Sequence, residues 1–402
     1  LERDISLFSD GALPVLHFPD HETLPYDPFS PHPDIIAERL ATLSGLAGMQ
    51  RGLVMAPIAT LMQRLPPRSH ALGQNIQLKT GQELVIDDFR QRLLQAGYSH
   101  ADPVYQAGQF AVRGSVIDLF PTGHTRPLRI DLFDEEIDSL REFDPDNQRS
   151  TGELDAFQML PAREYHCDPA SFDAMRKAFR YRFVVDTRNV TLYQDLRQGL
   201  HPQGLEQYLP LFFEHTESLF DYLPAKPLVV TQAGIEEAAD TFWATTNERW
   251  EQRRYDLERP ILEPEELFIS AGDTLQRLDA FATVRLLDAD QRHAKGQLFR
   301  TRKAPDLRIH DRGNEPAAAL VDFCEQFNGQ VMFAADTPGR REVLSDTLRA
   351  FGIQPTRVDT WGEFIASGEK RGLMVMPLEQ GFIASDEVAV LTESQLFGGR
   401  VR

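Results

Sequence analysis

LRIDLF, residues 128–133, has the pattern of a β-strand and lies in a run of short strands, GQFAVRGSVIDLFPTGHTRPLRIDLFDEEIDSLREF, at residues 108–143. Its apolar residues at positions 128, 130 and 132 alternate with Arg129, Asp131 and Phe133. Side chains along a strand point alternately to its two faces, so one face is entirely apolar and we expect it to be buried. The alternation leaves an aromatic ring, Phe133, on the polar face beside Arg129.

Two interpretations of Phe133 follow from this pattern. An exposed aromatic side chain next to an arginine has the composition of a binding hot spot. Alternatively, a neighbouring strand or loop covers the ring, and Phe133 is then a packing residue. The residues of this strand leave both interpretations open.

The composition excludes several classes of protein. The 402 residues suffice for two to four domains, and 42% of them are hydrophobic, which is enough for packed cores. No apolar run reaches the ~18 residues that indicate a membrane helix, and no secretory signal opens the chain. The net charge of −19 argues against a broad nucleic-acid-binding surface, although it is compatible with a local basic patch.

The chain has two cysteines, Cys167 and Cys324, far apart in the sequence. This usage fits a reducing cytoplasm, where we place the protein, and it excludes a disulfide framework or a zinc ribbon. The chain begins at Leu1 without a methionine, and LERDISLFS has the pattern of a helix that is already under way. We therefore expect a further segment upstream.

Residues 1–72 predict an α/β arrangement. A helix is expected over residues 34–47, with Asp34 as its N-cap. Residues 53–57 predict a buried strand, and residues 59–65 predict a short helix. This alternation favours a parallel sheet flanked by helices.

Residues 73–160 have a different pattern. A helix is expected over residues 87–96, closed by Gly97, and the acidic turn 134–136 is predicted to be a solvated hairpin tip. Short strands are expected at residues 110–119, 128–133 and 137–143. Together they predict a small α+β unit.

The remaining chain divides at a polar and basic stretch, residues 291–304, which is the best linker candidate. Before it, residues 204–224 predict an ordered irregular segment and residues 228–230 a buried strand. Helices are expected before the linker at 170–179, 234–253 and 274–282. After it, an α/β alternation is expected, with helices at 317–327 and 338–351 and strands at 330–334, 373–376 and 388–391. Cys324 falls on the apolar face of its helix and is interpreted as a core residue.

Signatures of catalysis are absent from the sequence. The string from Gly73 to Thr80 has the wrong spacing for a phosphate-binding loop. After the strand at 228–230 the chain reads TQAG at 231–234, so no carboxylate stands where a DExx box would hold magnesium. The chain contains no G-x-S-x-G elbow and no H-E-x-x-H motif.

Three weaker candidates are better explained as structural. His17, Asp20 and His21 are metal-capable, but they lie in a proline-containing loop without a helical i, i+4 pair. Residues 144–147, DPDN, resemble the start of a calcium loop without its sixth-position glycine. The adjacent pair 166–167, His-Cys, would point to opposite faces of a strand, which disfavours a base and thiol pair.

Several motifs resemble the bacterial transcription-repair coupling factors, the Mfd family. They are SPHPD at 30–34, MQRG at 49–52, TLMQR at 60–64, and the run from RG to DLFP over 113–121. LFDEEIDSLREFD, and LFDYLP at 219–224, also resemble the excision-repair helicase UvrB, which Mfd mimics in this part. The resemblance covers nearly the whole chain, and the pair RGxxxDLFP and LFDEEIDSL is quite specific to these two families.

The resemblance implies an α/β architecture with a degenerate helicase-like domain of the P-loop NTPase type, built on a parallel sheet. Residues 1–74 and 161–290 would form this domain, interrupted by the α+β unit 75–160 as a UvrA-binding insert. Residues 291–304 would link it to a separate small α/β domain at 305–402. In the family, a polymerase-binding module and two ATP- and magnesium-dependent motor domains follow, outside this chain.

The resemblance also implies a function for the insert. In the family this unit recruits UvrA to RNA polymerase stalled at DNA lesions, with the surface that UvrB offers. The residues carried over by motif are Arg113 in AVRG, Arg129 in LRID and Phe133 in LFDE. Each arginine would supply a forked donor for UvrA carboxylates, and Phe133 would fill an apolar pocket. The resemblance therefore favours an exposed Phe133.

We expect no catalytic residue, cofactor or metal in this chain. UvrB carries a phosphate loop, a DExH box and a long aromatic hairpin that clamps DNA. Here TQAG occupies the DExH position and YDPFSPHPD, residues 26–34, replaces the hairpin, while the phosphate-loop position lies upstream of Leu1. ATP hydrolysis belongs to the motor domains, which also contact DNA, and no membrane is involved.

Three hypotheses about function remain. The chain is a module that recruits UvrA, or a UvrB-type DNA-dependent ATPase, or a scaffold whose surface at 113, 129 and 133 packs against the motor half of the same polypeptide. The first and third are compatible if the surface is masked until the motor moves, which would be autoinhibition. No role is assigned to residues 305–402, where GRR at 339–341 is either an anion-binding helix start or solvated surface.

Overall fold

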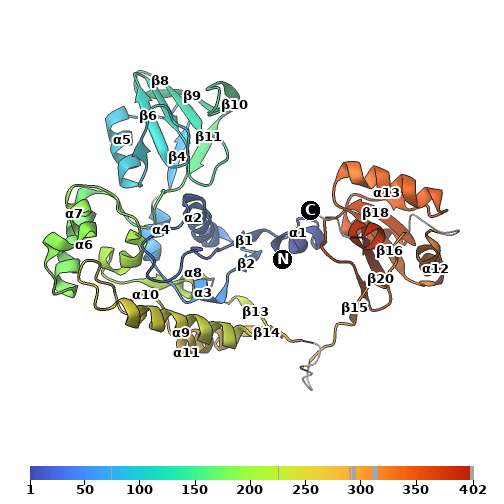
Figure 1. The fold of residues 1–402 in the computed structure, drawn as a ribbon. Coiled ribbons are helices and arrows are strands. Elements are labelled where there is room, and N and C mark those ends of the chain that lie inside the picture. Colours follow the sequence, from blue (N-terminus) through green and yellow to red (C-terminus); the bar gives the residue numbers. More distant parts are fainter. Residues whose placement is uncertain (74, 225, 289–290, 292–295, 310–315, 399–402) are drawn as a thin grey trace. The chain divides into compact units, whose positions relative to one another are not determined.

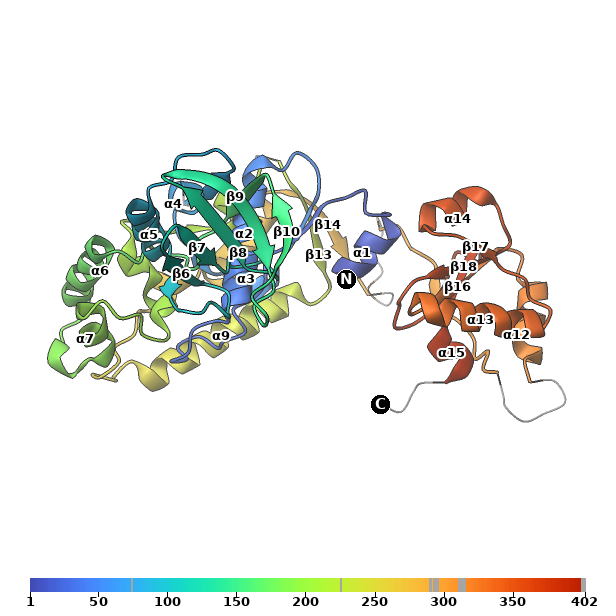
Figure 2. The ribbon, with the colours of Figure 1, turned by 90° about the horizontal axis from the view of Figure 1, so that it is seen from above.

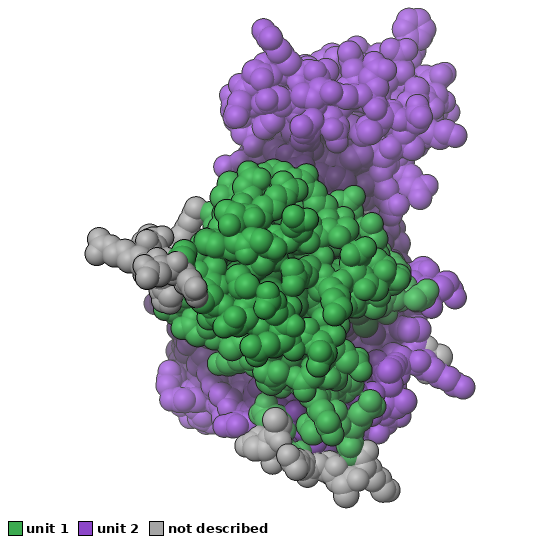
Figure 3. All heavy atoms as spheres, turned by 90° about the vertical axis from the view of Figure 1, so that its right-hand side faces the viewer, with its two compact units in different colours: residues 1–15, 51–53, 288–402 green, residues 16–50, 54–287 purple. Residues whose placement is uncertain are grey.

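The computed structural model describes the whole chain except residues 74, 225, 289–290, 292–295, 310–315 and 399–402 (Figure 1). The described residues divide into two compact units (Figure 3). The larger unit comprises residues 16–50 and 54–287, and the smaller unit comprises residues 1–15, 51–53 and 288–402. None of the helices in the described part combines the length and the apolar character that crossing a bilayer requires.

A six-stranded sheet dominates the segment that the sequence predicts as an α+β unit. Its strand order is β10-β9-β8-β7-β6-β5, and neighbouring strands are antiparallel except for the parallel edge pair β5 and β6. Figure 2 labels the strands from β6 to β10. The strands are β5 (Ser99–His100), β6 (Gln109–Arg113), β7 (Val116–Leu119), β8 (Leu128–Phe133), β9 (Glu136–Phe143) and β10 (Ser150–Leu154). The pair β4 (Ile76–Lys79) and β11 (Ala156–Met159) completes the unit. The predicted strands are confirmed.

Helix α5 (Ile86–Gln95) packs on one face of this sheet and confirms the predicted helix. Phe89 and Leu93 of α5 join the apolar residues of β6, β7 and β8 in one buried cluster. The helix ends before Gly97, whose φ of +86° favours glycine. A side chain at this position would also collide with Arg163, whose Cγ would lie 2.6 Å from the added Cβ.

Helix α2 (Pro33–Gly48) begins earlier than the sequence predicts. The predicted N-cap, Asp34, is wrong: His32 is the N-cap, and its side chain accepts a hydrogen bond from the Asp34 backbone N–H. Pro33 then occupies the first helical position, where its fixed φ and missing N–H are suited to a helix start. The strands on either side of α2 are β1 (Val15–His17) and β2 (Leu53–Met55), which pair with each other. Both are half-buried, so the fully buried strand expected at 53–57 is shorter and more exposed than predicted.

The strand predicted at residues 228–230 exists, but its predicted burial is wrong. It is β13 (Leu228–Gln232), which pairs in parallel with β14 (Ala282–Leu286). Leu228 is 63% exposed and Val230 52% exposed. Their exposure follows from the topology, because among the described residues β13 and β14 form a two-stranded sheet instead of the extended parallel sheet that the sequence predicts.

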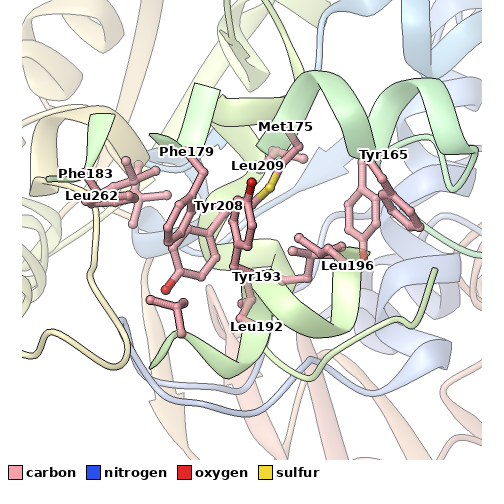
Figure 4. Close-up of a cluster of buried hydrophobic side chains, with 14 of the residues drawn as sticks. Tyr165, Met175, Phe179, Phe183, Leu192, Tyr193, Leu196, Tyr208, Leu209 and Leu262 are labelled. Atoms are coloured by element: carbon pink, nitrogen blue, oxygen red, sulfur yellow. The ribbon is translucent and has the colours of Figure 1, made fainter. Parts of the chain in front are cut away.

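An aromatic core lies between helices α6 (Pro169–Arg182) and α7 (Thr191–Arg197) and the 3-10 segment η2 (Leu205–Phe212) (Figure 4). Phe179 and Tyr208 are almost completely buried there. The Tyr208 hydroxyl donates to the carbonyl of Pro260 at 2.8 Å, which satisfies its polar end. The ordered irregular segment predicted at 204–224 is thus confirmed.

The other elements of the larger unit are short, except for the predicted long helix, α9 (Ile235–Arg253). The predicted helix at 274–282 lies three residues earlier, as α11 (Ala271–Asp279). The short elements are α3 (Ile58–Leu61), β3 (Arg64–Leu65), α4 (Arg68–Gly73), η1 (Thr187–Asn189), β12 (Glu217–Ser218), α8 (Leu219–Tyr222) and α10 (Pro264–Leu267).

The smaller unit contains a six-stranded mixed sheet in the order β15-β19-β20-β16-β18-β17. Its strands are β15 (Thr301–Lys303), β16 (Gln330–Ala335), β17 (Thr356–Arg357), β18 (Arg371–Val375), β19 (Phe382–Ala384) and β20 (Val388–Thr392). Its helices are α1 (Glu2–Phe8), α12 (Ala318–Gln326), α13 (Pro338–Ala350), α14 (Trp361–Ser367) and α15 (Glu393–Phe397). The elements predicted from residue 305 onward are confirmed.

Part of the predicted linker is a strand. Residues 301–303 form β15, which pairs with β19, and residues 292–295 of the linker lie outside the described part. The first helix, α1, packs on α14 through the rings of Phe8 and Trp361, whose centroids are 5.0 Å apart. The Asp10 carboxylate accepts hydrogen bonds from the backbone N–H groups that begin α14.

Candidate protein-binding surface

Strand β8 alternates as its sequence predicts. Leu128, Ile130 and Leu132 are buried against α5, whereas Phe133 is 74% exposed. The interpretation in which a strand or loop covers Phe133 is therefore wrong. The exposed ring lies on the face of the sheet that points away from α5. Arg129 lies on this same face.

A buried carboxylate joins the two predicted arginines. Asp118 on β7 lies opposite Arg129 on β8 and is 1% exposed. Its Oδ1 accepts a hydrogen bond from Arg129 Nε at 2.7 Å, and its Oδ2 accepts one from Arg129 Nη2 at 2.9 Å. Arg113, at the end of β6, donates to the same Oδ2. Asp118 therefore sets the positions of both guanidinium groups.

The structure corrects one detail of the predicted chemistry. The forked Nε–Nη2 edge of Arg129 is bound to Asp118, so it is not free for a partner's carboxylate. The remaining Nη1 lies 3.4 Å from the carbonyl of Gln148, and the guanidinium packs 4.7 Å from the ring centroid of Phe143. The hydrogen bond to Asp118 raises the pKa of Arg129. Arg129 is thus a fixed cation, and Arg113, with 43% of its side chain exposed, is the more accessible of the two.

The turn after β8 holds Phe133 at an exposed position. Phe133 pairs with Glu136 across the β8–β9 hairpin, and Asp134 in the turn has a left-handed φ of +54°. Residues 134–136 are all exposed, which confirms the predicted solvated tip. Because both strands continue into the packed sheet, Phe133 is presented on a rigid support instead of a free loop.

The predicted surface is therefore one face of β6, β7 and β8. The sequence argument missed Asp118, the residue that joins Arg113 and Arg129. A signal was present, because VIDLF places one acidic residue in an otherwise apolar strand. A buried acid requires a cationic or hydrogen-bonding partner, but the sequence does not say which cation meets it.

The weaker candidates have structural roles. His17 contacts Glu38 at 2.9 Å, whereas His21 lies 3.6 Å from Glu164, so the two histidines have different partners. The described residues contain no group of three or more His, Cys, Asp or Glu side chains that could hold a metal ion. Asp144 accepts hydrogen bonds from backbone N–H groups of the following turn, which makes it a turn residue.

Neither cysteine is suited to reaction. Burial raises the pKa of the Cys167 thiol to about 12 and that of Cys324 to about 11. Both thiols are therefore protonated at neutral pH and poor nucleophiles. The GRR string at 339–341, for which the sequence leaves open an anion-binding helix start or solvated surface, contains Arg340, which is paired with the buried carboxylate of Glu393. The string from Gly73 to Thr80 spans the end of α4, residue 74, which lies outside the described part, and β4.

Comparisons with known proteins agree with the resemblance in the sequence. Residues 76–165 match the UvrB interaction domain family, and residues 323–396 match the D3 domain of MFD. Over the whole chain, the transcription-repair-coupling factor of Escherichia coli K12 is 40% identical. The chain belongs to the transcription-repair-coupling factor family.

Other relatives in the family extend this similarity. The transcription-repair-coupling factor of Haemophilus influenzae is 38% identical over 96% of the chain, and that of Myxococcus xanthus is 32% identical over all of it. The chain spans about a third of the length of these relatives: 35% of the E. coli protein, 34% of the H. influenzae protein and 36% of the M. xanthus protein. The match to the UvrB interaction domain contains the whole predicted surface.

Proposed function

We propose that this chain is a non-catalytic module that recruits UvrA to RNA polymerase stalled at DNA lesions. The observation that supports this proposal most directly is the exposed Phe133. It lies on the same sheet face as Arg113 and Arg129, within the match to the UvrB interaction domain. Aromatic and arginine side chains are enriched at the centres of protein interfaces, where a few residues contribute most of the binding energy.

The charges of the surface favour a partner with carboxylates. Arg129 is fixed by Asp118, and Arg113 keeps an exposed side chain next to it. Fixed guanidinium groups lose little conformational entropy when a partner binds, which favours affinity. Phe133 would supply the apolar contact, and its 74% exposure leaves most of its area available for burial.

The remaining proposals concern the parent protein. Residues 161–290 and most of residues 1–74 form a degenerate helicase-like domain, whereas residues 1–15 group with the smaller unit. The chain itself binds no cofactor. Further domains of the polypeptide translocate on DNA, in a reaction that depends on ATP and magnesium, and contact RNA polymerase. The protein acts in the cytoplasm. These proposals are supported by the similarity to transcription-repair-coupling factors over about a third of their length.

Titration of this chain with UvrA by calorimetry tests the proposal. We expect binding by the wild type and loss of most affinity in Phe133→Ala, because the ring is the apolar anchor. Phe299→Ala is a matched control, since Phe299 is 72% exposed but lies outside the UvrB interaction domain match. Absence of wild-type binding would contradict the proposal, and ATP turnover by the chain would favour a UvrB-type ATPase instead.

A scaffold role is compatible with the same surface. If the surface packs against the motor half of the parent, the isolated chain should bind UvrA more tightly than the full-length protein does. Equal affinity of the two would exclude this autoinhibition.

A further inference from the structure

A loop lies over part of the sheet face that points away from α5. On β6, the residues Gln109, Ala111 and Arg113 alternate with two apolar residues that pack into the cluster around α5. Ala111 is paired with Asp118 in the strand register, so these three residues point to the same face as the Asp118 carboxylate. Each of the three contacts the loop formed by residues 101–108, which joins β5 to β6.

Apolar packing and an ion pair attach the first part of this loop to the strand. Val104 is completely buried in a small cluster with Ala111 and Phe120, separate from the cluster that contains α5. Nearer the end of β6, Arg113 Nη1 donates to Asp102 Oδ1 at 3.4 Å. The loop therefore lies along β6, on the face from which Arg113 is presented.

Tyr105 occupies an exposed position in this loop. Gln109 Oε1 accepts hydrogen bonds from the backbone N–H groups of Tyr105 and Gln106, both at 3.0 Å. These bonds and the buried Val104 fix the backbone around Tyr105, yet this residue is 56% exposed. A partner can bury a side chain on a fixed backbone at little further cost in conformational entropy. Tyrosine is also one of the residue types enriched at interface hot spots.

Tyr105 and Phe133 lie within the span of one interface. Tyr105 is held at the start of β6, and the five residues of this strand extend about 13 Å from there to Arg113. Phe133 lies near the Arg113 end, because the preceding residue, Leu132, donates its backbone N–H to the carbonyl of Ser115 in the β6–β7 turn. A typical interface covers about 800 Å² on each partner, a disc about 30 Å across. A single partner can therefore contact both aromatic residues.

We propose that Tyr105 is a second aromatic anchor of the recruitment surface and that UvrA buries its ring together with that of Phe133. This inference rests on the proposed function. It extends the surface from β6, β7 and β8 to the loop before β6. It also adds an apolar contact that the three residues identified by motif do not supply.

Calorimetric titration of UvrA with Tyr105→Ala and Tyr105→Phe in the full chain tests this assignment. We expect Tyr105→Ala to weaken binding about tenfold, the loss typical of one contributing interface side chain. Tyr105→Phe should bind within about twofold of the wild type, because the ring supplies most of the contact area. Tyr181→Ala is the matched control, since Tyr181 is 94% exposed on α6 and lies outside the UvrB interaction domain match.

The outcomes separate this inference from the proposed function. Wild-type affinity in Tyr105→Ala, together with loss of binding in Phe133→Ala, would overturn the role of Tyr105 and leave UvrA recruitment intact. An equal loss in Tyr105→Phe and Tyr105→Ala would overturn the ring contact, as would an equal loss in Tyr181→Ala. No binding by the wild type would contradict the proposed function itself.

Discussion

Substitution of Asp118 should loosen the sheet and the surface together. Asp118→Asn keeps the shape of the side chain but removes the charge that pairs with Arg113 and Arg129. The new amide group also places a donor where the carboxylate accepted hydrogen bonds. We therefore expect both arginines to lose their fixed positions.

The structure sets the size of the effect. Breaking a fully buried ion pair costs about 3–5 kcal/mol. Asp118 is buried, but the side chains of Arg129 and Arg113 are 20% and 43% exposed and can regain water. We discount the loss accordingly to about 2 kcal/mol. At 25 °C this corresponds to a change of about thirtyfold in an opening equilibrium.

Hydrogen exchange measured by mass spectrometry localises the effect. Peptides covering β6 to β9 should lose protection by about thirtyfold, whereas peptides from the smaller unit should not change. The affinity of the Asp118→Asn chain for UvrA should also fall by about tenfold, because the arginines are no longer preorganised. Asp138→Asn is the control, since Asp138 is exposed on the neighbouring strand β9. Unchanged protection together with unchanged affinity in Asp118→Asn would refute this reasoning.

Two further predictions concern buried ionisable groups. Burial raises the pKa of Glu164, but Arg39 and His21 outweigh this effect and lower it to about 2 from its ordinary value of 4.5. The resulting stabilisation, about 3 kcal/mol, is present above pH 4.5 and is lost as the pH falls towards 2. In chemical denaturation, Glu164→Gln should therefore be less stable than the wild type at pH 7 and closer to it at pH 3, and a constant gap would contradict the assignment. The raised pKa values of Cys167 and Cys324 predict slow reaction with a thiol reagent at pH 8 in the folded chain and fast reaction after denaturation; equal rates would show that the thiols are accessible.

Local patterns in the sequence predicted the elements, and contacts between distant residues decided most of the exceptions. The alternation in β8 correctly buried Leu128, Ile130 and Leu132, because it depends on strand geometry alone. The burial of Leu228 and Val230 was wrong, since it depends on which strands stand beside β13. Apolar character identifies a strand but not the number of its neighbours.

The binding surface shows the same limit. Exposure of Phe133 was one of two interpretations of its strand, and the resemblance to Mfd favoured it before the structure showed it. The Asp118 carboxylate lies eleven residues from Arg129 in the sequence, and only the β7–β8 register brings them together.

The most direct test of UvrA recruitment compares the affinity of wild-type chain and Phe133→Ala for UvrA in one calorimetric series. Phe133 is 74% exposed and is not one of the buried core residues, so its removal should leave the circular dichroism spectrum and the melting temperature unchanged. We predict clear binding by the wild type and by Phe299→Ala, and loss of most affinity in Phe133→Ala. Equal binding by all three proteins, or no binding by the wild type, would contradict the assignment of this surface to UvrA.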